Sequence, residues 1–222
     1  MKKLLTLTVL IGSVLSVSSA LSQTHYRGLQ CVKDYYGVRD SSNNDPDLVE
    51  VRFSPDLATQ LLQDIVARSN MQLNPSAVDC DHIANATAFQ PEDNDGLPDS
   101  LRSRHFIIYN SLWVREVLGE SRDRAIFLLG HELGHISRHH LTSRKTISDL
   151  EKESEADFEG ACAVARLGGE WAVVEELISR LRGEVDTDYP SAKTSMRLAR
   201  AAFRECGGNH EQKVNYPDTK II

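Results

Sequence analysis

The chain has 222 residues, of which 41% are hydrophobic and 26% are charged, and its formal net charge is −7 at pH 7. An acidic chain lacks the positive surface that binds phosphate backbones, so we expect no nucleic-acid partner. The length suits one domain with a sizeable core, and no change in composition along the chain indicates a second domain.

The first residues have the three-part layout of a secretory signal peptide. Lys2 and Lys3 precede an apolar stretch at residues 4–17, and small residues follow it, among them Ala20 and Ser22. Cleavage after Ala20 or after Ser22 fits this pattern equally well.

We therefore predict that residues 1–22 are a signal peptide and that residues 23–222 form a single exported domain, periplasmic or secreted. Loss of the two lysines would change the formal net charge from −7 to −9. The apolar stretch is short and contains Thr, Ser and Gly, so we expect no stable membrane insertion after cleavage. An uncleaved N-terminal anchor is the alternative.

The cysteines are even in number, and in an exported chain this predicts disulfides. They are Cys31, Cys80, Cys162 and Cys206. Four cysteines allow three pairings, of which we favour Cys31 with Cys80 and Cys162 with Cys206, because each pair would join elements within one half of the domain. None of them has the CxxC spacing of a metal site.

The first clear helix signal is Ser54 followed by Pro55. Serine is a favoured N-cap, and proline is favoured as the first helical residue. An apolar stripe with helical spacing follows at Leu57, Leu61 and Ile65. We expect this stripe to face the core.

Two further helices are predicted between residues 111 and 136. Ser111 opens the first of them, and Gly119 ends it. Ser121 is in position to cap the second. The second helix has apolar residues at helical spacing, namely Ile126, Leu129, Leu133 and Ile136.

This second helix carries the sequence His131-Glu132-Leu133-Gly134-His135. Because an α-helix turns once per 3.6 residues, His131 and His135 lie on one face and can share a metal ion. Glu132 lies one step round the helix, from where it can reach a water on the metal without being a ligand. This is the HExxH arrangement of zinc peptidases.

Ser148 and Glu151 form a capping box that begins the next predicted helix. Glu153 and Asp157 are then one turn apart. A carboxylate at Glu153 would complete a two-histidine, one-glutamate set and leave the fourth zinc position open, as in catalytic sites. Asp157 could accept the second N–H of a ligand histidine and fix its tautomer.

Neighbouring side chains offer competing roles. Glu155 is the alternative ligand, but it lies off the face of the two other carboxylates. We expect it, together with Glu151 and Glu159, on a solvated acidic face. His139 and His140 follow the HExxH motif, and we expect them to be structural residues near the end of the helix, where imidazolium suits the helix dipole.

The acidic helix is predicted to stop at Gly168-Gly169. The helix after it carries an apolar stripe that we expect in the core. This stripe consists of Trp171, Val174, Ile178 and Leu181.

Together these residues resemble the gluzincin peptidases, and within them the family of the CAAX prenyl protease and the periplasmic beta-barrel-assembly-enhancing protease. The resemblance covers most of the chain from about Asn85 onward. It rests on HExxH and on a Glu-x-x-Ala-Asp motif at residues 153–157, whose first Glu is the ligand in that family. Residues 85–89 and 106–110 loosely match the Asn-Ala segment and the short strand that precede the family's HExxH helix.

The resemblance implies an α+β fold: a mainly helical, zincin-like metallopeptidase domain with a small β-sheet beside the HExxH helix. In many zinc peptidases an edge strand pairs with the extended substrate, so the strand around Ile107 is expected to be such an edge. The family also has a His-Pro followed by an Arg, where this chain reads Tyr189-Pro190 and Arg197.

The family histidine is implied to lie near the metal, and this chain has a tyrosine in its place. A phenol can donate to a developing oxyanion, which makes Tyr189 a candidate catalytic residue. The alternative is that Tyr189 begins the last helix and packs against it. Both interpretations stay open at the level of sequence.

The chemistry predicted from these residues is zinc-dependent hydrolysis of peptide bonds. One Zn²⁺ held by His131, His135 and Glu153 would polarise the scissile carbonyl, and Glu132 would be the general base. The expected partner is a peptide or an unfolded protein substrate. The alternative function is a zinc-binding, catalytically silent protein of the same fold with a chaperone-like or regulatory role.

Overall fold

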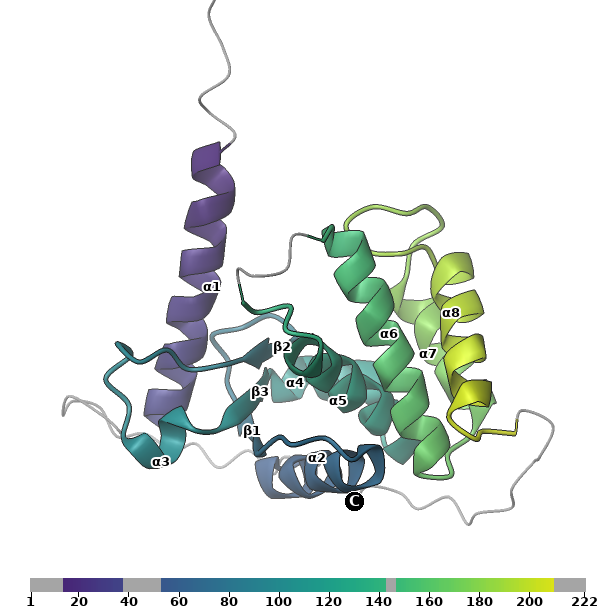
Figure 1. Cartoon of the computed structure of the whole chain (residues 1–222), viewed down its shortest axis with the longest axis horizontal. Coiled ribbons are helices and arrows are strands. Elements are labelled where there is room, and N and C mark those ends of the chain that lie inside the picture. The colour runs from purple at the N-terminus through teal and green to yellow at the C-terminus, as the bar shows by residue number, and fades with distance from the viewer. Residues whose placement is uncertain (1–13, 38–52, 143–146, 210–222) are drawn as a thin grey trace, which may run out of the picture.

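A mixed three-stranded sheet is packed among helices (Figure 1). The computed structural model describes residues 14–37, 53–142 and 147–209. The strands are β1 (Pro75–Asp79), β2 (Ala86–Phe89) and β3 (His105–Tyr109). The helices are α1 (Val14–Tyr35), α2 (Pro55–Ser69), α3 (Asp99–Arg102), α4 (Ser111–Leu118), α5 (Arg122–Ser137), α6 (Asp149–Arg166), α7 (Trp171–Leu181) and α8 (Ala192–Glu205). The prediction of a mostly helical fold with one small sheet is confirmed.

β3 is the central strand, because the order of the sheet is β1-β3-β2. It is parallel to β1, where Ile107 pairs with Ala77, and antiparallel to β2, where Ile107 pairs with Ala88. The expectation that the strand around Ile107 is an edge is therefore wrong, since both of its sides are used. β2 is the edge strand that lies beside α5.

Alternate residues of β3 enter two separate clusters of buried side chains. Phe106 and Ile108 pack with Val32 of α1 on one face of the sheet. Ile107 and Tyr109 join the larger cluster, which also contains buried residues of α2 and of α4 to α8. Because both faces of β3 are buried, its sequence is a continuous apolar run rather than an alternating one.

Small residues allow α5 and α6 to approach closely. A Cβ atom added to Gly130 of α5 would lie 2.7 Å from the Cβ of Ala163, and one added to Gly160 of α6 would lie 2.7 Å from the backbone oxygen of Phe127. Such distances are too short for real carbon atoms. The two helices that carry the predicted metal ligands therefore need glycine at these crossing points.

Replacing Gly160 with Ala is expected to destabilise the protein by about 1–3 kcal/mol, because the new methyl group meets backbone that has no room to yield. Alanine is the better helix former, so helix propensity alone predicts the opposite sign. Gly183→Ala is the matched control, since a Cβ at Gly183 has no atom within 4 Å. Denaturant unfolding measures both effects, and equal stability of the two variants would contradict this description of the crossing.

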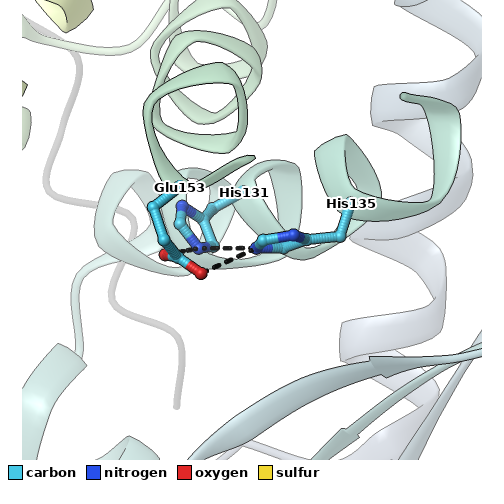
Figure 2. Close-up of side chains that lie close together, drawn as sticks. All are labelled: His131, His135 and Glu153. Carbon is cyan, nitrogen blue, oxygen red and sulfur yellow. Dashed lines mark hydrogen bonds and ion pairs between the residues drawn. The ribbon is translucent and has the colours of Figure 1, made fainter. Parts of the chain in front are cut away.

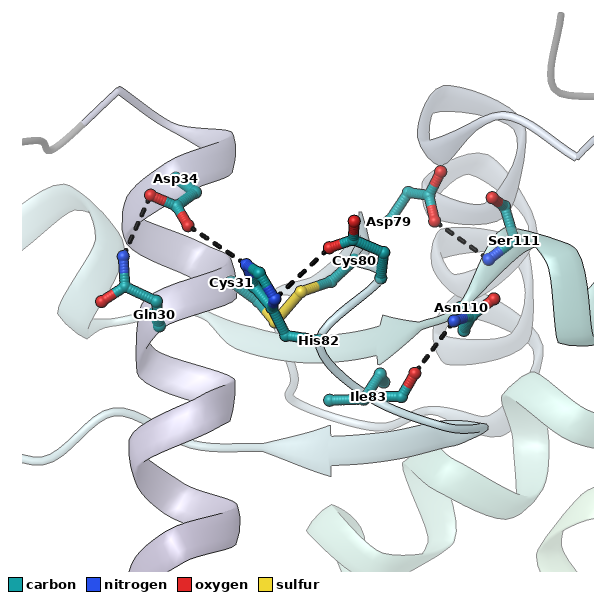
Figure 3. Close-up of a disulfide and its surroundings, with 10 residues drawn as sticks. Gln30, Cys31, Asp34, Asp79, Cys80, His82, Ile83, Asn110 and Ser111 are labelled. Carbon is teal, nitrogen blue, oxygen red and sulfur yellow. Dashed lines mark hydrogen bonds and ion pairs between the residues drawn. A yellow bond between two sulfur atoms is a disulfide. The ribbon is translucent and has the colours of Figure 1, made fainter. Parts of the chain in front are cut away.

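Two disulfides have the predicted pairing, Cys31 with Cys80 and Cys162 with Cys206. The first joins α1 to the residue after β1 (Figure 3), and the second joins α6 to the end of α8. Their sequence separations are 49 and 44 residues. Closing loops of this length restricts the unfolded chain, which stabilises the fold by roughly 2–4 kcal/mol for each bridge.

The segment that leads into β2 is held by the start of α4 (Figure 3). The Asn110 side chain donates to the backbone oxygen of Ile83 over 2.9 Å, and the Ser111 backbone N–H donates to Asp79 over 3.0 Å. The oxygen of the Asn110 side chain also caps α4 by accepting from the N–H groups of Leu112 and Trp113. The start of α4 is thus bonded both to the end of β1 and to the segment that precedes β2.

Local signals predict the helix starts well. Ser54, Ser121 and Ser148 each accept a hydrogen bond from a backbone N–H three residues on, as N-caps do. α4 begins at Ser111, and α6 ends just before Gly168, whose φ is 74°. These boundaries depend on neighbouring residues only, which is why the sequence predicts them.

The sequence does not predict α1. This helix extends from Val14 through both expected cleavage positions, whereas residues 1–13 of the predicted signal peptide lie outside the described residues. In the part of the chain that the structure describes, no helix combines the length and the apolar character that a membrane span needs.

Candidate metal centre

His131 and His135 project from α5 toward Glu153 of α6 (Figure 2). The Nε2 atoms of the two histidines are 3.2 Å apart. Glu153 Oε2 lies 3.3 Å from Nε2 of His131, and Glu153 Oε1 lies 3.5 Å from Nε2 of His135. The three predicted ligands therefore meet at one point, where they can hold a metal ion.

One oxygen of Glu153 is not satisfied by the protein. The Oε2 atom is buried and has no partner in hydrogen-bonding geometry, and its neighbours in ion-pair range are His131 Nε2 at 3.3 Å and Arg182 Nη2 at 3.6 Å. A buried carboxylate oxygen without a partner is costly. A cation between Glu153 and the two imidazoles would be that partner.

Asp157 is fully buried behind His131. Its Oδ1 accepts from Nδ1 of His131 at 3.1 Å and from Nη2 of Arg182 at 2.6 Å, and its Oδ2 accepts from the Ser195 hydroxyl at 2.6 Å. Burial by itself would raise the pKa of Asp157, but the hydrogen bonds and the nearby positive charges lower it overall. The ionised carboxylate fixes Nδ1 of His131 as a donor and leaves Nε2 for a metal, as predicted for this residue.

His140 makes the corresponding contact with His135. The Nδ1 atoms of the two rings are 3.1 Å apart, and Nε2 of His140 lies 2.8 Å from Glu155 Oε2. An ionised Glu155 only accepts, so Nε2 of a neutral His140 donates to it and Nδ1 of His140 accepts from His135. The Nε2 atom of His135 then carries the lone pair that faces Glu153.

The expectation that Glu155 and Glu159 lie on a solvated face is wrong. Glu155 contacts the buried His140, and Glu159 is itself buried and bonded to Arg138 at 2.5 Å. Sequence reasoning also missed the contact between His140 and His135. The reason is local: His139 has a φ of 61°, a left-handed turn that brings the chain back toward the helix.

Arg182 and Ser195 were not singled out in the sequence either. Arg182 follows α7 and Ser195 lies in the first turns of α8, so both reach Asp157 only through tertiary packing. No spacing rule connects them with the HExxH motif.

Glu132 is buried next to the three converging side chains, with 7% of its surface exposed. Burial raises the pKa of Glu132 above its usual value, and the charge of Glu153 raises it further. The charge of His131 and a hydrogen bond from the backbone of Ala88 act in the opposite direction. Because Ala88 belongs to β2, Glu132 connects the three predicted ligands with the edge strand.

A cleft of about 720 Å³ opens at these side chains. It is lined by residues 83–88, by Leu181 and by Tyr189, in addition to the predicted ligands and Glu132. Leu181 was expected in the core, but it is 38% exposed and forms part of the cleft wall. The other residues of that stripe, which are Trp171, Val174 and Ile178, are buried as predicted.

Tyr189 does not begin the last helix, so that alternative is wrong. α8 starts at Ala192 after the N-cap Ser191, and Tyr189 precedes them in a loop. Its ring lies over the guanidinium of Arg182, with a distance of 4.9 Å from the carbon of that group to the ring centre. The side chain is 49% exposed and faces the same cleft as Glu153.

The site thus combines three side chains that can hold a metal ion with a buried carboxylate, Glu132, all on the wall of one cleft. Asp157 and His140, which contact the two histidines, lie behind this wall. Two imidazoles and one carboxylate are a donor set for a divalent cation. Glu132 lines the same cleft and interacts electrostatically with His131 and Glu153. The chain matches no protein-family model, no curated protein and no solved structure.

Proposed function

We propose that the chain is an exported zinc-dependent endopeptidase of the gluzincin type. The observation that carries the proposal is the convergence of His131, His135 and Glu153 beside the buried Glu132. The Glu-x-x-Ala-Asp spacing supports it, since Glu153 faces the ligands and Asp157 contacts His131. The family resemblance and the zincin-like fold are parts of the same proposal.

Zn²⁺ fits the three side chains. Tetrahedral ligands at about 2.0–2.2 Å from zinc are about 3.3–3.6 Å from one another. The separations of 3.2, 3.3 and 3.5 Å between the ligand atoms agree with this geometry. Nitrogen and oxygen donors from three side chains are also the set found in catalytic zinc sites, where one position is left for water or substrate.

In the proposed mechanism His131, His135 and Glu153 hold the metal, and Asp157 and His140 keep the two imidazoles in the ligand tautomer. When bound, Zn²⁺ supplies a Lewis acid that polarises a carbonyl and makes a nearby water more acidic. Glu132 accepts a proton from the attacking water. It then donates that proton to the amine nitrogen as the peptide C–N bond breaks.

β2 is the proposed docking edge for an extended substrate. Its residues 86–88 line the cleft, and Ala88 contacts Glu132. An extended peptide that adds to this edge by backbone hydrogen bonds would pass directly by Glu132. The Tyr189 hydroxyl, on the same cleft, is proposed to donate to the oxyanion that forms on the carbonyl oxygen.

Affinity for Zn²⁺ is expected to increase about tenfold per pH unit between pH 6 and 9. Burial lowers the pKa of His131, but hydrogen bonds to Asp157 and Glu153 raise it overall to about 10. Burial and the neighbouring His131 lower the pKa of His135 to about 3. The two imidazoles thus share one proton near neutral pH, and that proton must leave the pair when the metal binds.

Competition titration with a zinc chelator at several pH values measures this slope. The number of protons released per zinc can be checked by calorimetry in buffers of different ionisation enthalpy. An affinity that does not change with pH would show that the two imidazoles do not exchange a proton for the metal.

Hydrolysis of unfolded casein by the purified chain distinguishes the peptidase from the silent zinc-binding alternative. The expected result is the appearance of new amino groups and of shorter fragments. A protein without a catalytic role has no need of a buried carboxylate beside the trio, so Glu132 favours the peptidase. Zinc binding without cleavage of casein would favour the alternative.

Export is proposed from two features. Disulfides persist mainly in oxidising compartments, and the chain has two of them. The expected signal peptide at residues 1–22 has the same implication. Substrates in that case are polypeptides met in the periplasm or outside the cell.

A further inference from the structure

Exposed apolar side chains surround the mouth of the cleft. Leu141 is 42% exposed, Leu181 is 38% exposed and Tyr189 is 49% exposed, and all three line the cleft. They come from the segment after α5, from the end of α7 and from the loop before α8. Large exposed apolar side chains that cluster at the rim of a pocket indicate a binding surface for apolar groups of a ligand.

The interior of the cleft continues this apolar surface as far as the metal ligands. Phe127 and Leu128 precede His131 by one turn of α5, so they lie on the helical face of that ligand. Ile178 of α7 and Trp113 of α4 also line the cleft. An apolar side chain that enters here would contact residues one helical turn from His131.

Most charged side chains in the cleft are already paired with another charged or ionisable side chain of the protein. Arg182 is bonded to Asp157 at 2.6 Å, and Glu153 faces the two ligand histidines. Apart from these residues and Glu132, Arg27 is the charged side chain among the described lining residues. A charged substrate side chain would lose its hydrating water in this cleft and find few groups of opposite charge to replace it. An apolar side chain instead gains about 25 cal/mol of binding free energy for each Å² of surface that it buries.

We infer that the cleft selects a large apolar residue, such as Leu, Phe or Met, beside the bond to be cleaved. This inference rests on the proposed function, because it names the substrate class of the same site. Large apolar residues are buried in folded proteins. The preferred substrate class is therefore extended, unfolded polypeptide, in which more of these residues are accessible than in folded proteins.

Peptide binding tests this inference without requiring turnover. We would load the full-length chain carrying Glu132→Gln with zinc and measure its affinity by fluorescence anisotropy for two labelled ten-residue peptides. One peptide has a central Leu-Phe pair, and the other has Ala-Ala in its place. The Leu-Phe peptide is expected to bind at least about tenfold more tightly.

A matched pair of leucine variants locates the effect. Leu181→Asn, made in the same background, is expected to remove most of the tenfold difference between the peptides. Leu112→Asn is the control, since Leu112 is 58% exposed and lies outside the cleft lining. Both substitutions are at exposed positions, so both proteins are expected to fold.

Equal affinity for the two peptides, or equal effects of the two leucine variants, would overturn the inference. The casein experiment tests the proposed peptidase activity independently of the peptide preference. If casein is not cleaved but the Leu-Phe preference depends on Leu181, the inference holds and the proposed peptidase activity fails. If casein is cleaved without a preference for large apolar residues, the proposed function holds and the inference fails.

Discussion

Replacing Glu132 with Gln is expected to reduce kcat for peptide hydrolysis by about 10²–10⁴-fold while one zinc ion stays bound to each chain. Gln has almost the same shape but cannot accept the proton of the attacking water. Glu132 is not one of the three side chains that could hold the ion, so metal affinity should change little. Casein cleavage gives kcat, and the zinc content of the same preparation gives the number of ions bound per chain.

Glu116→Gln is the control for this substitution, because Glu116 is an exposed residue of α4. It should leave both the turnover and the zinc content unchanged. If Glu132→Gln retained normal turnover, the general base would have to be another group, and the mechanism proposed for this cleft would be wrong.

Replacing Glu153 with Gln is expected to weaken zinc binding by at least about a hundredfold, more than the effect typical of residues that only orient a ligand. The substitution removes the negative charge that lies 3.3 Å from His131 and 3.5 Å from His135. Peptide hydrolysis at limiting zinc should fall in parallel. Competition with a chelator gives the affinity.

Glu151→Gln is a matched control for Glu153, since Glu151 is exposed and lies on the same helix two residues earlier. It should leave zinc affinity unchanged. Equal losses in the two variants would mean that the effect comes from the overall charge of α6 and not from ligation.

Much of the candidate site could be predicted because it depends on helical spacing. His131 and His135 share a face through the geometry of one helix, and Glu153 and Asp157 share a face through that of another. What the sequence cannot specify is the approach of α5 to α6. That approach depends on glycines at crossing points, such as Gly130 and Gly160, whose partners are far away in the chain.

Parts of the site that depend on long-range packing were missed. Arg182, which follows α7, and Ser195 of α8 both bond to Asp157. No local sequence pattern predicts these contacts. His140 was assigned only a structural role, because its contact with His135 requires the left-handed backbone of His139. A non-glycine residue in that conformation is uncommon, which explains why a continued helical face was the natural expectation.

The error about the edge strand has a similar cause. The apolar run around Ile107 correctly predicts a strand, but the order of strands in a sheet is not encoded in any one of them. β1 at residues 75–79 was not predicted, and it occupies the side of β3 that was expected to be free. The docking edge proposed for the substrate moves to β2 as a consequence.

Stepwise return of zinc to the metal-free protein tests the central claim most directly. Casein hydrolysis should increase linearly with added Zn²⁺ and level off at one ion per chain, in protein that has kept both disulfides. Hydrolysis by the metal-free chain, or a chain that binds one zinc and still does not cleave casein, would contradict the account of this site as a zinc peptidase centre.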